Sequence, residues 1–449
     1  MQYDMVIHGG LVVYPERIVR ADVGIQGSVI KTLSSDASLK GKSELDADGC
    51  YVLPGLIDPH THPVYLDDLG GLARTAACGG VTTVIHYAYA KPGESLVEII
   101  GQWKEEGEAM SCIDFALHGG LFETAKQVDE IPRAFEMGVT SYKVFMAYAK
   151  LGWMTDDYAM AKCMDVVARQ GGMVAVHAET GLAIDYIQDR MLEEKADFAE
   201  RFLETSPDIA EAEGIFRAVH IGRLMHCPVY IPHISSEEGL AVVRFMKGRG
   251  IHLYAETCPQ YLGLTWDRLK DRGPLGKVGP SIKTERDRVA LWQAVSEGVI
   301  DTIGSDHAPK DKKIDDDFFE APYGSPEIET MLPVVWHFGV NSGYITPNEI
   351  AELLSERTSR IMGLYPQKGR LDAGSDADVV IFDPTEKWTV SNDNQHSNAT
   401  YTLFEGMELL GAVRTVVSRG ELVFNKGKFS GVKGRGRFIP TRAGQYTQQ

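Results

Sequence analysis

Residues 55–63 read GLIDPHTHP, an apolar run that ends in two histidines one residue apart. On an extended strand, residues i and i+2 point to the same face, so His60 and His62 can direct two ring nitrogens to one point. A surface turn that carries two histidines is an equally simple interpretation, because metal sites need three or more protein ligands. The rest of the chain must decide between a metal site and a turn.

Seven similar β-prone runs follow this stretch, and helix-prone segments such as 96–110, 158–170 and 237–250 lie between them. With the first run included, they are GLIDPHTH, VTTVIHYA, IDFALHGG, TSYKVFMA, MVAVHAE, VYIPHIS, IHLYAET and VIDTIGSDH. Short β-prone runs that alternate with helices predict parallel strands joined by crossover helices. Eight such units predict an α/β protein built on a (β/α)8 TIM barrel.

The two ends of the chain have a different sequence pattern, without the alternation of β-prone and helix-prone segments. Residues 1–53 and the region around 377–429 contain short strands separated by glycine turns. A chain of 449 residues exceeds the length at which one hydrophobic core stops growing, so an accessory domain fits beside the barrel. We expect a small β-sandwich domain formed by both termini, residues 1–53 and 368–449, and a catalytic barrel over residues 54–367.

Composition narrows the possible partners. The net charge of −18 would repel phosphate backbones and anionic membrane surfaces, so we expect neither a nucleic-acid nor a membrane partner. Six well-separated cysteines without a CxxC pair indicate reduced, mostly buried thiols. The N-terminal sequence lacks the pattern of a signal peptide and no stretch is long enough to span a bilayer, so we predict a cytoplasmic protein.

Each β-prone run ends near a polar residue that can bind a metal ion or transfer a proton. In chain order these residues are His60 and His62, His86, His118, Lys143, His177, His233, Glu256, and Asp306 with His307. The carboxyl ends of barrel strands meet on the face where active sites lie. His86, His118 and His252 are interpreted as structural residues. Four histidines at strand ends, together with Asp306, can hold one or two divalent ions, of which zinc is the expected one and manganese, cobalt or iron are alternatives; the four are His60, His62, His177 and His233.

Lys143 does not fit this set as an ammonium, because it has no lone pair and a metal ion repels it. Two interpretations are open. Either the side chain points away and its strand is only structural, or the amine has reacted with carbon dioxide to give a carbamate whose two oxygens bridge a pair of ions.

Nine segments over nearly the full length of the chain resemble the cyclic amidohydrolases of the dihydropyrimidinase and hydantoinase family. They are DPHTH (58–62), GGVTTVIHYAYAKPGESL (79–96), SYKVFMAY (141–148), VHAE (176–179), PHISS (232–236), YAETCPQYL (254–262), SDHAP (305–309), GSDADVVIFDP (374–384) and KGRGRF (433–438). Each segment alone is a weak signal, whereas their order and spacing together are specific.

The resemblance implies a pair of metal ions and assigns ligands to them. The matching positions are His60, His62 and Asp306 for the more buried ion, His177 and His233 for the more exposed ion, and Lys143, carboxylated, as the bridge between both.

The resemblance also implies residues that contact the substrate. Tyr148 matches the tyrosine whose hydroxyl supports the developing oxyanion, although an aromatic wall residue is the simpler interpretation of that position. Ser281 and Tyr323 lie where the family holds the ring amide through main-chain groups.

The implied reaction is the opening of a hydantoin or dihydropyrimidine ring to an N-carbamoyl amino acid. A pair of divalent ions lowers the pKa of a bridging water and polarises a carbonyl, so that hydroxide can attack the ring amide. Asp306 would carry the proton to the leaving ring nitrogen, and Tyr148 would stabilise the oxyanion.

Several alternatives are open. Val64 stands where dihydroorotase-like members carry an arginine, which favours an uncharged ring. Allantoinase and cyclic imidase activities are alternatives on the same scaffold, and loops of the substrate pocket could supply the hydrogen bonds that the ureido group of allantoin needs. AKLGWMTDD (149–157) and APYGSP (321–326) depart from the hydantoinase pattern, so ring size, side-chain preference and stereochemistry stay open. A mononuclear deaminase is a rival within the enzyme class, but it would not need Lys143.

A non-catalytic scaffold like the collapsin response mediators would have lost metal ligands, whereas all six positions here hold residues that can bind a metal ion. From the family we expect a homotetramer, with a dimer as the alternative.

Overall fold

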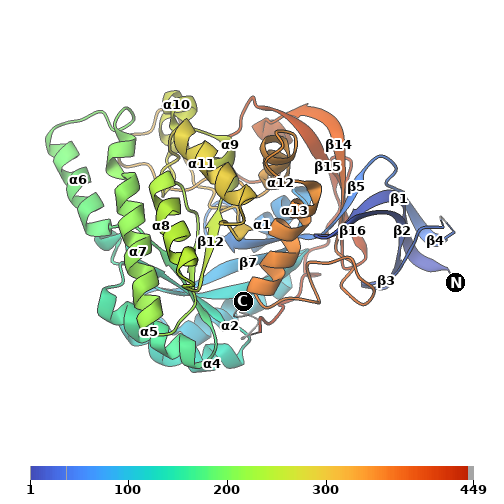
Figure 1. Cartoon of the computed structure of the whole chain (residues 1–449), viewed down its shortest axis with the longest axis horizontal. Helices are drawn as coiled ribbons and strands as arrows, with labels where there is room; N and C mark the ends of the chain where they lie inside the picture. Colours follow the sequence, from blue (N-terminus) through green and yellow to red (C-terminus); the bar gives the residue numbers. More distant parts are fainter. Residues whose placement is uncertain (1, 37, 443–449) are drawn as a thin grey trace.

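The computed structural model describes residues 2–36 and 38–442, and its centre is a barrel of parallel strands (Figure 1). The strands are β6 (Leu56–Thr61), β7 (Val81–Ala90), β8 (Asp114–Leu121), β9 (Ser141–Phe145), β10 (Met173–His177), β11 (Val229–Ile231), β12 (Leu253–Thr257) and β13 (Thr302–Ile303). They pair in chain order from β6 to β13, and a parallel bridge between Thr61 and His307 joins the two edges. The predicted (β/α)8 barrel is confirmed.

Helices surround the barrel. They are α1 (Leu69–Cys78), α2 (Leu96–Met110), α3 (Thr124–Gln127), α4 (Ile131–Glu136), α5 (Asp157–Arg169), α6 (Gly181–Glu193), α7 (Asp208–Leu224), α8 (Glu237–Gly248), α9 (Pro259–Gly263), α10 (Trp266–Leu269), α11 (Glu285–Ser296), α12 (Met331–Val335), α13 (Pro347–Ala351) and α14 (Arg357–Ile361). Several begin at a side chain that accepts a hydrogen bond from the first turn: Ser95 caps α2, Asp156 caps α5 and Ser236 caps α8. The three predicted helical segments agree with α2, α5 and α8 within two residues.

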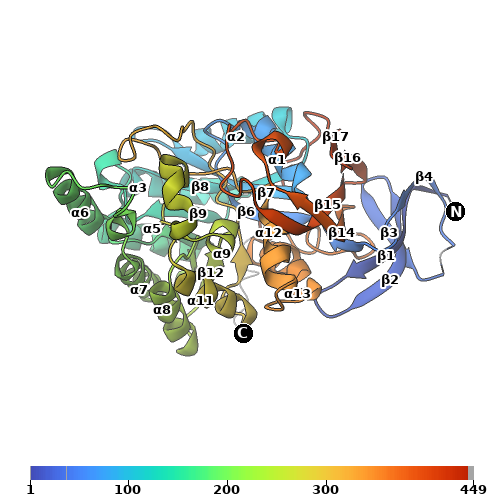
Figure 2. The same cartoon turned by 90° about the horizontal axis from the view of Figure 1, so that it is seen from above.

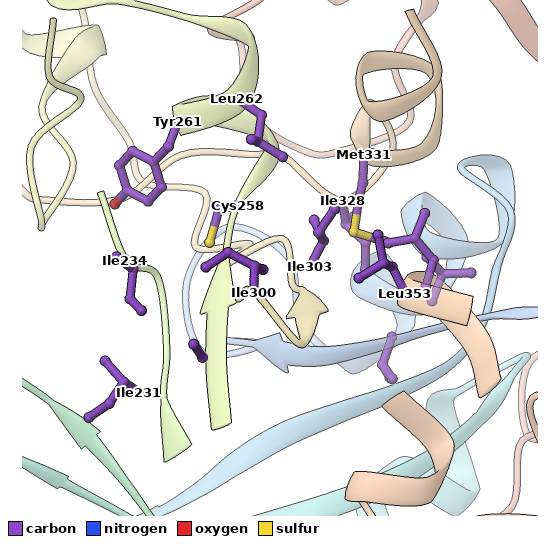
Figure 3. Packing of buried hydrophobic residues seen from close by; sticks show 14 of the residues in the cluster. Ile231, Ile234, Cys258, Tyr261, Leu262, Ile300, Ile303, Ile328, Met331 and Leu353 are labelled. Carbon is purple, nitrogen blue, oxygen red and sulfur yellow. The ribbon is translucent and has the colours of Figure 1, made fainter. Parts of the chain in front are cut away.

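Apolar side chains fill the space between strands and helices (Figure 3). Ile231 of β11 and Ile303 of β13 belong to the same buried cluster as Tyr261 and Leu262 of α9 and Met331 of α12. Full burial of such a side chain is worth about 1.5–3 kcal/mol. The packing therefore holds the strands from which the polar residues extend.

The two termini form a second sheet at one end of the molecule (Figure 2). Its strands are β1 (Tyr3–Val13), β2 (Ile18–Gln26), β3 (Val29–Ser34), β4 (Gly41–Asp46), β5 (Tyr51–Pro54), β14 (Val379–Thr389), β15 (Glu408–Ser418), β16 (Glu421–Asn425) and β17 (Lys428–Phe429). Strand β5 joins the N-terminal and C-terminal parts, because it pairs with both β1 and β14. The predicted β structure shared by both termini is confirmed as one nine-stranded sheet, whereas the domain boundaries at residues 53 and 368 stay a prediction.

Buried charges connect this sheet to the barrel. Lys368 Nζ lies 2.6 Å from Asp114 Oδ2, at the start of β8, and 2.7 Å from Asp378 Oδ2, directly before β14. Arg419 Nε donates to the other oxygen of Asp114 at 2.9 Å. All four side chains are buried, so the junction is stable only because the two cations and the two carboxylates neutralise each other.

The predictions about cysteines and membrane spans can be compared with the structure. The six cysteines are free and buried, as expected. Among residues 2–36 and 38–442, no helix combines the length and the apolar character needed to cross a membrane.

Candidate metal centre

A cavity of about 440 Å³ opens at the carboxyl ends of the barrel strands. All the residues predicted to bind metal or substrate line it: His60, His62, Lys143, Tyr148, His177, His233, Ser281, Asp306 and Tyr323. A larger groove of about 940 Å³ lies at the amino ends of β11 and β12 and contains none of them. We place the site in the smaller cavity, because the side chains that can perform chemistry meet there.

The first histidine pair meets Asp306 from the opposite edge of the barrel sheet. Oδ1 of Asp306 lies 2.8 Å from His62 Nε2 and 3.2 Å from His60 Nε2. One ligand atom from each of the three residues lies within 4.8 Å of the others, a spacing that could hold a metal ion. Burial would raise the pKa of Asp306, but His60, His62 and Lys143 lower it to about 2, so the carboxyl is ionised. Burial lowers the pKa of both histidines, which favours the neutral, metal-binding form of the ring.

The opposite ring nitrogens of this pair are held by further side chains. Nδ1 of His60 lies 2.7 Å from Glu256 Oε1, and Nδ1 of His62 lies 3.2 Å from the Tyr89 hydroxyl. Such partners orient a metal-binding histidine and fix its tautomer. Glycine at 304 permits the close packing, because a Cβ atom there would lie 2.5 Å from Glu256 Oε2.

A second histidine pair extends from β10 and from the loop after β11. His177 Nδ1 and His233 Nε2 lie 3.0 Å apart, and both residues are buried. The other nitrogen of His177, Nε2, lies 2.7 Å from Glu179 Oε2. The atoms left for a metal ion are therefore Nδ1 of His177 and Nε2 of His233, which already face each other.

Lys143 lies in the cavity wall between the two pairs and is buried. Its Nζ is 5.4 Å from the ring centroid of Tyr87 and 5.3 Å from that of Phe145. Burial lowers the pKa of the amine to about 8, although Asp306 and Glu256 act in the opposite direction. The side chain thus points into the site, as the carbamate interpretation requires, and a substantial fraction of it is neutral near pH 8.

The donor set fits divalent ions. It offers imidazole nitrogens and a carboxylate, together with an amine that can become a carboxylate-like ligand, and these are ligand types that zinc accepts. Three of the lining residues, Tyr148, His233 and Asp306, have a positive φ of 67°, 45° and 51°. Non-glycine residues in this region cost about 1–3 kcal/mol each and cluster at functional sites.

Tyr148 projects its hydroxyl into the cavity beside the second pair. Its ring centroid is 4.9 Å from that of His177, and the hydroxyl lies 3.0 Å from the position of a Cβ on Gly279. Burial raises its pKa well above the usual value, and the charge of Glu179 adds to the shift. The phenol is therefore protonated and can donate a hydrogen bond.

The two predicted main-chain contact positions line the same cavity, and the Tyr323 ring centroid lies 6.5 Å from that of Tyr148. Ser281 is fully buried, and its hydroxyl has no hydrogen-bond partner among the described residues. The Tyr323 hydroxyl accepts a hydrogen bond from Gln188 Nε2 at 3.3 Å, and burial raises its pKa.

The histidines interpreted as structural lie outside the set of candidate metal ligands. His118 bonds to the Pro59 carbonyl at 2.9 Å and to the Ser141 hydroxyl, and His86 packs against Trp103 and Phe115. His252 is exposed and does not line the cavity.

Sequence reasoning missed the partners Glu179 and Tyr89 and gave Glu256 no role. A signal for Glu179 was available, because it follows His177 by two residues in VHAE. The contacts of Glu256 and Tyr89 join distant segments, and no local pattern reveals them.

Comparisons with known proteins agree with this geometry. The model of the amidohydrolase family matches residues 51–423. The D-hydantoinase of Rhizobium radiobacter is 33% identical over 98% of this chain and 99% of the relative. The D-hydantoinase of Geobacillus stearothermophilus is 33% identical over 96% and 95%, respectively. The crystal structure of dihydropyrimidinase from Brevibacillus agri superimposes with a TM-score of 0.94 at 33% identity, covering 98% of this chain and 99% of that one.

The chain therefore belongs to the amidohydrolase family and, within it, to the hydantoinase and dihydropyrimidinase group of metal-dependent cyclic amidohydrolases.

Proposed function

We propose that this enzyme opens the cyclic amide bond of a hydantoin or a dihydropyrimidine and releases an N-carbamoyl amino acid. The observation that carries the proposal is the convergence of six potential ligands, from distant parts of the chain, on one cavity. The full-length similarity to hydantoinases and a dihydropyrimidinase supports the same reaction.

Two divalent ions, with zinc the expected metal, fit this donor set. His60, His62 and Asp306 would hold one ion, His177 and His233 the other, and carboxylated Lys143 both. When bound, such a pair supplies hydroxide at neutral pH and polarises the scissile carbonyl.

The remaining steps belong to side chains of the chain itself. As the hydroxide oxygen bonds to the carbonyl carbon, Asp306 would accept the hydroxide's proton at its carboxylate and pass it to the ring nitrogen when the carbon–nitrogen bond breaks, which is general acid–base catalysis. The neutral Tyr148 hydroxyl donates to the carbonyl oxygen as negative charge develops there. Main-chain groups at Ser281 and Tyr323, which line the same cavity, hold the ring amide in place.

A substrate panel tests the proposal. Hydantoin, 5-substituted hydantoins of both hands, dihydrouracil, succinimide, allantoin and dihydroorotate are incubated with metal-loaded enzyme, and ring opening is followed by absorbance and mass. We expect turnover of hydantoins or dihydrouracil. Turnover of allantoin alone, or of succinimide alone, would replace the proposal with an allantoinase or a cyclic imidase.

We propose a homotetramer, with a dimer as the alternative. Large apolar side chains are exposed on α5, α6 and α7, which lie together at the end of the molecule opposite the terminal sheet (Figure 1). Tyr158 is 81% exposed, Tyr186 67% and Leu224 71%. A monomer by light scattering at micromolar protein would refute the assembly.

We also propose a cytoplasmic location, which the free, buried cysteines support.

A further inference from the structure

The cavity contains a cation that the proposed reaction does not use. Lys310 lies four residues after Asp306, on the loop that follows β13, and lines the same cavity as the metal ligands. Its side chain is partly buried, and burial lowers its pKa to about 8. An ammonium in such a place needs a partner, because a charge removed from water without one is costly.

Lys310 differs from the other accessory lysines of the cavity in its partners. Lys277 donates to the carbonyls of Phe318 and Phe319 at 3.0 and 2.6 Å, and Lys150 pairs with Asp189. For the Lys310 ammonium, no hydrogen bond or ion pair is found within the described part of the chain, and the contact of its Nζ is with the Tyr65 ring, 2.8 Å from the centroid. Apart from Lys143, which belongs to the proposed metal centre, Lys310 is therefore the cavity lysine among the described residues whose donors are free for a ligand.

Asp306 does not fill this need. Its charge acts on Lys310, but Oδ1 is directed at His60 and His62, 3.2 and 2.8 Å away. In the proposed function, Asp306 binds a metal ion and moves a proton, so its charge serves the reaction centre. Because no carboxylate among the described residues pairs with Lys310, its ammonium can bind an anion from outside the chain.

The position of Lys310 relates it to specificity. It contacts Tyr65, the residue directly after Val64, which is the uncharged position considered above for carboxylate binding. The loop after β6 has the uncharged Val64 at this position, and Lys310 from the loop after β13 supplies a positive charge beside it. The long lysine side chain can move off the Tyr65 ring toward a substituent that extends from the ring held at the metal centre.

We propose that Lys310 pairs with a carboxylate on the side chain of the substrate, so that the enzyme prefers cyclic amides with an anionic substituent. This inference rests on the proposed function and names the substrate class of that same site. The ammonium–carboxylate pair forms in a partly dehydrated cavity, where charge-assisted hydrogen bonds are stronger than neutral ones.

A matched pair of substrates tests the proposal. 5-(2-Carboxyethyl)hydantoin and 5-(2-carbamoylethyl)hydantoin have the same number of non-hydrogen atoms and differ in charge. We expect the wild-type enzyme to favour the acid over the amide by about tenfold in kcat/KM, the equivalent of about 1.4 kcal/mol. Lys310→Met should reduce this ratio to about one, Lys310→Arg should retain most of it, and the exposed Lys126→Met should leave it unchanged.

A binding measurement provides a readout that does not depend on turnover. Titration calorimetry compares N-carbamoylglutamate with N-carbamoylglutamine, the two ring-opened products, on wild type and Lys310→Met. We expect wild type to bind the glutamate product more tightly and the variant to lose the difference.

The outcomes separate the two proposals. Turnover of the amide with a ratio of one or less in wild type would overturn the role of Lys310 and leave the cyclic amidohydrolase proposal standing. If neither hydantoin, nor any other cyclic amide of the panel, is opened, both proposals fall.

Discussion

Lys143 is the residue whose chemistry matters most. As a buried amine with a lowered pKa, it can react with carbon dioxide more readily than an exposed lysine, because only the neutral form has a lone pair to donate. The sequence placed it at a strand end with the histidines, but it could not show which way the side chain points. The structure directs it into the cavity.

The pH dependence of carbamate formation follows from this pKa. With a pKa of about 8, the neutral fraction of the amine rises from about 9% at pH 7 to about 50% at pH 8. At constant carbon dioxide pressure, we expect the metal-free protein to form the carbamate roughly fivefold faster at pH 8 than at pH 7, as measured by isotope incorporation. A rate that does not change over this range would contradict the assignment.

Tyr148 provides a second prediction at this scale. Tyr148→Phe keeps the ring contacts with His177 and removes the hydroxyl, so the developing oxyanion loses one donor. We expect kcat to fall by about 10²–10³-fold while the metal content stays the same. An unchanged kcat would contradict the role of the hydroxyl in oxyanion stabilisation and would leave Tyr148 as an aromatic residue of the cavity wall.

At the scale of elements, the strands of the barrel could be predicted from the sequence, whereas strand β4 and the conformation of the loop after β9 could not. The alternation of β-prone and helix-prone segments is a local signal, and the barrel follows from it. Strand β4 was missed because its sequence, GKSELD, is polar and largely exposed. Pairing with β1 stabilises it, and that contact between segments leaves no periodic pattern in the sequence.

The loop after β9 shows the same limit. Ala149–Leu151 form a single turn between two residues of positive φ, Tyr148 and Gly152, and Trp153 then stacks on Phe122 with the ring centroids 4.5 Å apart. The sequence indicated a departure from the family here. Only the packed structure shows that the loop closes one aromatic wall of the cavity.

The junction between β8 and β14 gives a prediction about stability. Lys368→Met removes the cation shared by Asp114, Asp376 and Asp378 and leaves their charges in a buried place. We expect the free energy of unfolding to fall by about 3–5 kcal/mol, because removing one partner of a buried pair leaves the other charge buried and uncompensated. Denaturant titration measures it, and a loss below 1 kcal/mol would contradict the account.

A surface lysine provides the matched control for that experiment. Lys126, whose side chain is 76% exposed, pairs with Glu123 three residues earlier. We expect Lys126→Met to change stability by no more than about 0.5 kcal/mol.

For the whole molecule, the terminal sheet and the barrel have separate tasks. The barrel brings the six candidate ligands together from five different strand ends, and segments from both ends of the chain pair in the terminal sheet (Figure 2). The sequence predicted both parts and six candidate ligands that the structure brings to one cavity, because each leaves a local motif. The histidine partners and the free cation Lys310 depend on contacts between distant segments, which one sequence does not display.

The number of metal ions per chain tests the central claim most directly. Wild-type protein loaded with zinc and bicarbonate is passed through a desalting column, and zinc is measured against protein by elemental analysis, in parallel with Lys143→Ala. We predict about two ions per chain for wild type, and one or none, with loss of hydrolysis, for the variant. One ion per wild-type chain, together with an active Lys143→Ala variant, would contradict a metal pair bridged by this lysine.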